Sequence, residues 1–237
     1  GRILRPLRTL AVGRRQELNR LFEVITTNET SFYRNPPQLK VFQDMVLKDV
    51  LDKQRKLKQK RLRIWSAGCS TGEEPYTIAI YLLERWPLID DYEVEILSSD
   101  IDTTVLESAQ RGVYSARSVG QVPPEYLARY FKQRGANEFV LSRDLVGAVD
   151  FSRVNLTDAN DTRAFRDIDI VFCRNLLIYF DDLSRRVAAE AMYDAMSPGG
   201  FICLGHSESM SRITNLFQVR RFADAMVYQK PLNGERA

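Results

Sequence analysis

The side chains of this sequence that could do chemistry stand directly after short apolar runs. A loop with two glycines, residues 68–72, follows one run and leads into a pair of glutamates. Asp100 follows a second run, and an arginine and an asparagine at 174–175 follow a third. If these runs are parallel strands, their carboxyl ends meet at one edge of a sheet, where open α/β sheets bind ligands. The pattern therefore predicts a ligand pocket at that edge.

The loop and the acid indicate what kind of ligand the pocket takes. Glycines let the backbone approach a ligand closely, and Asp100, 28 residues beyond Gly72, is placed to accept hydrogen bonds from ribose hydroxyls. However, Glu73 and Glu74 stand where the pyrophosphate of a dinucleotide would need N–H donors. Two acids suit a nucleoside with cationic ends, such as the amine and sulfonium of S-adenosylmethionine (SAM), better than NAD or ATP.

The elements that must position these groups alternate between strands and helices. Such alternation requires a parallel sheet that is covered on both faces, so the fold class is α/β, a doubly wound domain from about residue 62 onward. Residues 1–25 are expected to form a helical segment, and a helix is expected to begin at Asn35 and Pro36, with Asn35 as its cap. Residues 138–141 and 149–151 form either a small antiparallel excursion or an edge of the main sheet. The expected core elements are strands at 62–67, 93–98, 168–173 and 201–204, and helices at 76–83, 103–111 and 183–195.

Charge and cysteine content limit the classes of protein. The 237 residues carry a net charge of +3, but residues 1–63 hold 16 basic and 6 acidic side chains, which is typical of a surface that meets an acidic partner or of a solvated helix face. The basic run at 53–63 lacks interleaved aromatic residues, so nucleic acid is not the expected partner. Three widely spaced cysteines indicate free thiols and a cytoplasmic location. No apolar run approaches the ~18 residues of a membrane span, so no membrane insertion is expected.

Five ordered blocks of the sequence form a distinctive set. The blocks are TNETSFYR at 27–34, WSAGCSTGEEPY at 65–76, SDID at 99–102, FCRNLLIYFD at 172–181 and GHSES at 205–209. With these blocks the sequence closely resembles the chemotaxis receptor glutamate O-methyltransferases of CheR type, from about Asn28 to the C-terminus. The resemblance implies a class I SAM-dependent methyltransferase domain that converts glutamate side chains of chemotaxis receptors to γ-methyl esters, with S-adenosylhomocysteine as the second product.

The same resemblance implies roles for individual residues. Glu74 and Asp100 match the acids that bind the methionine amine and the ribose, and Asn155 and Leu156 resemble the contact near adenine. The catalytic residues it implies are Arg34 and Tyr179. The full set of implied cofactor-binding residues is Asn28, Thr30, Arg34, Glu74, Asp100, Asn155, Leu156, Arg174 and Asn175.

The chemistry of methyl transfer agrees with these roles. A glutamate with a pKa near ~4.3 is already ionised at neutral pH, so its attack on the methyl group needs no strong general base. Arg34 could hold the substrate carboxylate, and Tyr179 could donate a hydrogen bond or fix its orientation. His206, the only histidine, is therefore expected to have a structural role, Cys69 to be a packing residue, and no metal site is predicted.

Two departures from the family and several rival functions stay open. Fewer than 30 residues precede Asn28, where the family has a longer helical domain, so 1–25 is expected to be a remnant of it and 26–237 the methyltransferase domain. A small β subdomain is expected at about 132–152, of the type that acts without a tethering peptide. The expected partners are cytoplasmic receptor helices, and the protein is expected to be a monomer. The rivals are a dinucleotide-dependent oxidoreductase, a SAM-sensing module without catalysis, and a methyltransferase of another protein or a small molecule.

Overall fold

A seven-stranded sheet forms the centre of the computed structural model, which describes residues 30–222 and 225–232. Its strand order is β6-β2-β1-β7-β8-β10-β9, and β6, β2, β1, β7 and β8 run parallel while β10 and β9 are antiparallel additions at one edge. The strands are β1 (Arg61–Ala67), β2 (Glu93–Asp100), β6 (Val149–Arg153), β7 (Ile168–Cys173), β8 (Met196–Leu204), β9 (Gln218–Arg221) and β10 (Met226–Gln229).

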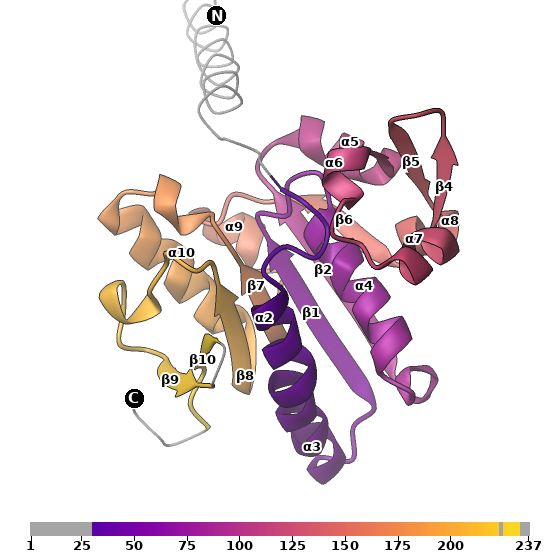
Figure 1. The fold of residues 1–237 in the computed structure, drawn as a ribbon. Coiled ribbons are helices and arrows are strands. Elements are labelled where there is room, and N and C mark those ends of the chain that lie inside the picture. The colour runs from indigo at the N-terminus through magenta and orange to yellow at the C-terminus, as the bar shows by residue number, and fades with distance from the viewer. Residues whose placement is uncertain (1–29, 223–224, 233–237) are drawn as a thin grey trace, which may run out of the picture.

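Helices cover both faces of this sheet (Figure 1). The strands and helices expected between residues 62 and 204 are present, with the glycine loop leading directly into α4, so the doubly wound α/β fold is confirmed. The longer helices are α3 (Lys48–Lys56), α4 (Glu73–Arg85), α5 (Thr103–Arg111) and α10 (Asp182–Ala195). The shorter ones are α2 (Pro36–Val41), α6 (Ala116–Val119), α7 (Pro124–Tyr130), α8 (Arg143–Gly147) and α9 (Ala159–Thr162), with π-helical η1 (Phe42–Leu47) and 3-10 turns η2 (Ile89–Asp91), η3 (Leu177–Tyr179) and η4 (Met210–Arg212).

The central strand β7 is apolar in all positions but one because both of its faces pack against helices. In β7, Ile170 and Phe172 face the core formed with α2, η1, α3 and α4, whereas Val171 and Cys173 face the core formed with α10. All six residues of β7 are buried. This alternation explains why Ile168 and residues 170–173 are all apolar, a pattern typical of a parallel strand between two helical layers, with Asp169 as the one charged residue of the strand.

The first helical run of the described residues lies along β1 (Figure 1). The helix begins at Pro36 as expected, but Asn35 adopts a left-handed conformation with φ of 62° and makes no side-chain cap. Its backbone oxygen accepts instead from the N–H groups of Gln38 and Leu39. The run is fastened to the sheet by Asp169 of β7, which is fully buried and accepts from Lys53 Nζ at 3.2 Å.

A second, three-stranded sheet contains β3 (Val113–Ser115), β5 (Glu138–Leu141) and β4 (Phe131–Arg134), in the order β3-β5-β4. The small β subdomain thus differs from the one expected at about 132–152. Its outer strand β3 lies before that interval, and β6, which lies within it, pairs with β2 of the main sheet. The small sheet also supports the glycine loop, since the Tyr114 hydroxyl donates to the Thr71 carbonyl at 2.9 Å. The helix expected at 1–25 lies outside the described residues, and the expected domain boundary stays a prediction. Among the described helices, none has the length and hydropathy needed to cross a bilayer.

Candidate functional site

A cavity of about 650 Å³ opens at the carboxyl ends of β1, β2, β6 and β7. From β1 the chain adds β2 and β6 on one side of the sheet and then β7 and β8 on the other side, so the strand order reverses between β1 and β7. Open α/β sheets bind ligands at such a switch point. The volume lies within the ~300–1,000 Å³ of small-molecule sites. The walls include the glycine loop, the end of β2, residues 154–157 after β6, residues 174–181 after β7 and residues 30–34.

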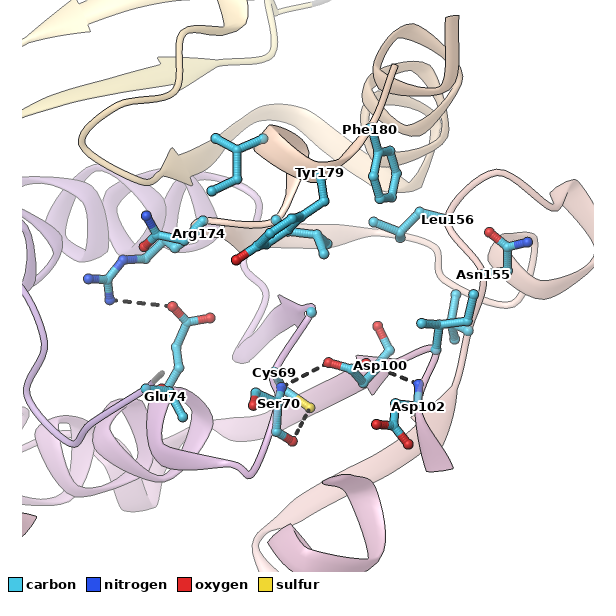
Figure 2. Close-up of a pocket in the computed structure, with 18 of the residues that line it drawn as sticks. Cys69, Ser70, Glu74, Asp100, Asp102, Asn155, Leu156, Arg174, Tyr179 and Phe180 are labelled. Atoms are coloured by element: carbon cyan, nitrogen blue, oxygen red, sulfur yellow. Dashed lines mark hydrogen bonds and ion pairs between the residues drawn. The ribbon is translucent and has the colours of Figure 1, made fainter. Parts of the chain in front are cut away.

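Glu74 and Arg174 form a charged pair in the wall of this cavity (Figure 2). Arg174 Nη1 lies 3.3 Å from Glu74 Oε2, and only 7% and 14% of the two side chains are exposed. Ser66 donates to the other Glu74 oxygen at 2.7 Å, and Arg174 Nη2 donates to the Arg34 carbonyl at 2.7 Å. Burial raises the pKa of Glu74, and the charge of Arg174 opposes that rise. A buried carboxylate of this kind favours a second cation beside it.

Asp100 is oriented at the end of β2 by two backbone N–H groups. Ser70 N donates to Oδ2 at 2.9 Å and Asp102 N donates to Oδ1 at 3.1 Å. Burial raises the pKa of Asp100, while these hydrogen bonds lower it. Each carboxylate oxygen keeps further acceptor capacity, so the group can accept hydrogen bonds from a ligand diol. Asp102 caps α5 through Thr104 N at 2.8 Å, as a helix-capping aspartate is expected to do.

Only one of the two glutamates after the glycine loop faces the cavity, which corrects the expectation for Glu73. The Glu73 side chain is buried beneath the loop, where it accepts from Thr71 Oγ1 at 2.6 Å and Ser118 Oγ at 2.8 Å. Consecutive residues in the first turn of a helix point about 100° apart, so one of the pair points into the pocket and the other into the protein. Glu73 therefore holds the loop in shape, and Glu74 provides the charge.

Asn155 and Leu156 lie at the opposite end of the cavity from Glu74 (Figure 2). Leu156 is buried and offers an apolar wall. The Asn155 side-chain oxygen accepts from Thr157 N at 3.0 Å and from Thr157 Oγ1 at 2.8 Å, which makes a tight turn of the loop. The two ends of the cavity thus differ in character, with charges at one end and apolar surface at the other.

Most of the remaining expected residues line the same cavity. Thr30, Arg34, Asn175 and Tyr179 all belong to its walls. Arg34 is exposed at the rim, and its charge helps to lower the pKa of Glu74. Tyr179 belongs to the 3-10 turn η3 after β7, with 43% of its surface exposed. Asn28 lies outside the described residues.

A buried carboxylate at Glu208 was not among the expected site residues, although it belongs to the block at 205–209. Glu208 Oε2 accepts from Asn175 N at 2.7 Å and from Gly205 N at 2.8 Å, and Oε1 accepts from Leu177 N at 2.8 Å. It thereby ties the loop after β7 to the loop after β8. The sequence shows only that an acidic residue follows the end of a strand. The three N–H groups that it binds come together only when β7 and β8 pair in the sheet.

His206 and Cys69 are both excluded from acid–base roles at the pocket by their surroundings. His206 is exposed and does not line the cavity. Cys69 lines the cavity but is buried, and burial together with the charges of Asp100 and Glu74 raises the pKa of its thiol well above the ordinary value. A thiol with a raised pKa is a poor nucleophile, which agrees with a packing role.

The side chains of the cavity fit a nucleoside with a charged tail. Two buried polar atoms of its walls, Arg174 Nε and Ser70 Oγ, have no hydrogen-bond partner among the described residues. Buried polar groups without partners are rare in native structures, so both are suited to receive a polar ligand. Glu74 presents a carboxylate to a cation, and Asp100 presents one to a diol. Gly68 adopts φ of +78° with Leu176 against it, which leaves no room for a larger side chain at this turn.

The fold and site together define a doubly wound nucleoside-binding domain with an acidic pocket. The family described as "CheR methyltransferase, SAM binding domain" matches residues 28–226. The chain belongs to this family, and its cofactor is SAM.

Relatives along most of the chain agree with this assignment. "Chemotaxis protein methyltransferase 2" of Vibrio cholerae is 44% identical over 220 residues, which cover 93% of this chain and 75% of that protein. "Chemotaxis protein methyltransferase" of Vibrio parahaemolyticus is 33% identical, covering 94% and 80%. The protein of the same name from Borreliella burgdorferi is 32% identical, covering 84% and 71%. The protein is therefore an enzyme, a SAM-dependent methyltransferase of chemotaxis.

Proposed function

We propose that this protein transfers the methyl group of SAM to glutamate side chains on cytoplasmic helices of chemotaxis receptors, forming γ-methyl esters. The observation that supports this most directly is the charged pocket at the β1/β7 switch point, in which Glu74 and Arg174 stand opposite an apolar wall. The relatives' names indicate chemotaxis, and a carboxylate is the substrate group that such a pocket can methylate without a base. The protein acts in the cytoplasm, as a monomer, and without a tethering peptide.

The cofactor supplies a methyl group on a sulfonium sulfur, which makes that carbon electrophilic. Glu74 would hold the amine of its methionine part, because the carboxylate is buried and desolvated. Asp100 would accept from the ribose hydroxyls with the acceptor capacity left by Ser70 and Asp102. Leu156 would offer an apolar surface to the adenine ring, and Asn155 shapes the loop beside it. Thr30 and Asn175 complete the walls around these groups. Asn28 precedes them in the same block of sequence.

The substrate carboxylate needs alignment more than activation. It is ionised at neutral pH, so no residue has to remove a proton. Arg34, exposed at the rim, holds this carboxylate by charge-assisted hydrogen bonds. Tyr179 is half exposed at the same rim and donates its hydroxyl to fix the orientation. With no proton to remove, the rate enhancement that Arg34 and Tyr179 would supply is proximity and alignment of the substrate carboxylate.

The role of Arg34 is tested by Arg34→Ala. The side chain is exposed, so the variant is expected to fold, which circular dichroism checks before the assay. Loss of the charge that holds the substrate is expected to lower kcat/KM by about 100-fold or more. The matched control is Lys40→Ala, an exposed cation on α2 outside the cavity, which is expected to keep normal activity. Near-normal turnover of Arg34→Ala would remove Arg34 from the mechanism.

The function itself is tested by incubating the protein with labelled SAM and purified receptor cytoplasmic fragments. The expected product is a fragment whose label is released by mild alkali, as from an ester. Label that resists alkali would indicate a different acceptor atom. SAM binding without any label on receptor fragments would indicate a different substrate.

A further inference from the structure

A second depression, of about 330 Å³, lies beside the cofactor cavity. Ile178 lines both, so the two share a wall. The first turn of α10 separates them, since Asp181 and Ser184 face the cofactor cavity while Asp182 and Arg185 face the second depression. Ile178 and the first turn of α10 thus form a ridge between the two cavities. A polypeptide whose side chain enters the cofactor cavity past Ile178 contacts this ridge.

The second depression is rich in arginine. Arg185 is committed within the protein, with Nε donating to the Leu177 carbonyl at 2.8 Å and Nη1 to Asp182 at 3.0 Å. Arg186 and Arg212 are both exposed, and neither forms an ion pair with another residue in the described part of the chain. Two guanidinium groups therefore stand available to an anion.

The acids of this depression do not neutralise those two arginines. Asp182 is fully exposed and paired with Arg185. Both oxygens of Glu208 are engaged by the backbone N–H groups of Asn175, Gly205 and Leu177. An anion that binds here consequently meets Arg186 and Arg212 first.

The ridge between the two cavities is apolar and exposed. Leu183 in the first turn of α10 has 74% of its surface exposed, and Ile178 has 45%. Val187, one helical turn beyond Leu183, is also exposed and lies on the same face of α10. Exposed apolar side chains beside a cavity are typical of an interaction surface.

We infer that this ridge and depression dock the protein substrate, and that Arg186 and Arg212 receive a second carboxylate of the substrate, close in its structure to the glutamate that is methylated. An apolar side chain of the substrate packs on Leu183 and Ile178 between the two carboxylates. This inference rests on the proposed function, because it takes the cofactor cavity as the place where the target glutamate reacts. It makes the enzyme selective for glutamates that have an acidic neighbour.

The test uses a receptor cytoplasmic fragment whose methylated glutamates are first located by mass spectrometry. In a second version of the fragment, acidic residues within two helical turns of each methylated glutamate are changed to glutamine. With the wild-type enzyme, this neutral fragment is expected to show a KM raised about tenfold, which corresponds to ~1.4 kcal/mol. Arg186→Glu and Arg212→Glu are each expected to raise KM for the acidic fragment by a similar factor and to lose the discrimination between the two fragments.

Two controls separate this effect from a change in charge or folding. Arg111→Glu makes the same charge change at an exposed site on α5 outside both cavities and is expected to behave as wild type. Leu183→Ser is expected to raise KM for both fragments, whereas Leu57→Ser, at an exposed leucine after α3, is not. All variants are expected to bind SAM with wild-type affinity in calorimetry.

Three outcomes decide the inference. If Arg186→Glu and Arg212→Glu keep the wild-type KM, the depression is not part of the docking surface. If they raise KM equally for acidic and neutral fragments, the arginines attract the substrate without contacting a second carboxylate. If the wild-type enzyme labels neither fragment, the proposed function fails, and this result is separate from either of the others because it needs no variant.

Discussion

Two carboxylates of the pocket, Glu74 and Asp100, are buried, and each is held by hydrogen bonds that oppose the effect of burial on its pKa. Glu74 is desolvated between Arg174 and Ser66, and Asp100 is desolvated above two backbone N–H groups. Burial raises the pKa of both carboxyl groups from their ordinary values of 4.5 and 3.8. The unliganded pocket is thus a site where negative charge is costly and an added cation relieves the cost.

This cost predicts how SAM binding depends on pH. Near the raised pKa values a fraction of the Glu74 and Asp100 side chains is protonated, and a bound cation favours the ionised form. Binding is therefore expected to release protons, and affinity to increase as pH rises through those values. Calorimetry at a series of pH values from the ordinary carboxyl range up to neutral, in two buffers of different ionisation heat, measures the protons released.

Glu74→Gln is expected to reduce both the affinity and the proton release. Glu107→Gln, an exposed acid on α5 outside the cavity, is the control and is expected to change neither. Proton uptake on binding would contradict this account of the pocket.

The same raised pKa values also determine how the free energy of unfolding depends on pH. An acid whose pKa is higher in the folded than in the unfolded state reduces the free energy of unfolding as pH rises from its unfolded to its folded pKa. These acids therefore destabilise the unliganded protein at neutral pH.

At the level of elements, the site depends on loops that are tied to one another. Glu208 joins the loop after β8 to the loop after β7, which bears Asn175 and Tyr179. Tyr114 of the small sheet and the buried Glu73 both hold the glycine loop. The walls of the cavity are thus fixed from outside it, and substitutions that touch no ligand can still alter activity.

Glu208→Gln tests this positioning role. An amide cannot accept hydrogen bonds from all three N–H groups, and its own N–H₂ group would face one of them. The free energy of unfolding is expected to fall by about 2–3 kcal/mol, measured by urea denaturation. Because the loop with Tyr179 is then less ordered, kcat is expected to fall even with saturating SAM and at a temperature where the protein is folded. An unchanged kcat in a destabilised protein would limit Glu208 to a structural role.

A pair of glycines tests the shape of the cofactor loop. Gly72 has φ of +91°, and an added Cβ would lie 2.9 Å from Ala109 Cβ and from a Tyr76 ring carbon. Gly135 also has positive φ, but nothing lies within 4 Å of its added Cβ. Gly135→Ala is expected to cost about 1 kcal/mol, and Gly72→Ala about 2–4 kcal/mol, because only the second adds a steric clash to the backbone strain. Thermal and urea unfolding measure both, and equal losses would contradict the close approach at Gly72.

On the scale of the whole molecule, the pocket lies where two cores meet across one sheet. One core contains α2, α3 and α4 with one face of the sheet, and the other contains α10 with the opposite face. A ligand at the strand ends contacts loops that leave both cores. Its binding energy is consequently added to the stability of the entire domain.

SAM is therefore expected to stabilise the whole protein against heat. At about 100 times its Kd, a ligand contributes ~2.7 kcal/mol, which for a chain of this length raises Tm by about 5–10 °C. NAD at the same concentration is expected to have no effect, because its pyrophosphate would face Glu74. Scanning calorimetry compares the two ligands. Stabilisation by NAD alone would support the dinucleotide-dependent oxidoreductase instead.

Local sequence determined the elements and most of the pocket. The mostly apolar runs at 62–67 and 168–173 predict buried parallel strands because each has apolar residues on both of its faces. Asp100 and Arg174 stand at or directly after the ends of such strands. The expected residues Thr30, Arg34, Glu74, Asp100, Asn155, Leu156, Arg174, Asn175 and Tyr179 line one cavity. Their roles in binding and catalysis stay predictions that the experiments above address.

Only the tertiary structure decided which of several similar residues face the ligand. Glu73 and Glu74 are alike in sequence, but packing against Ser118 buries the first and leaves the second in the pocket. Strand β6 belongs to the main sheet and not to the small one, because it pairs with the edge of β2, about 50 residues earlier in the chain. Glu208 acquires its role from N–H groups on another loop. Strand pairing and burial depend on contacts between residues far apart in the chain. The local pattern of a sequence cannot predict such contacts.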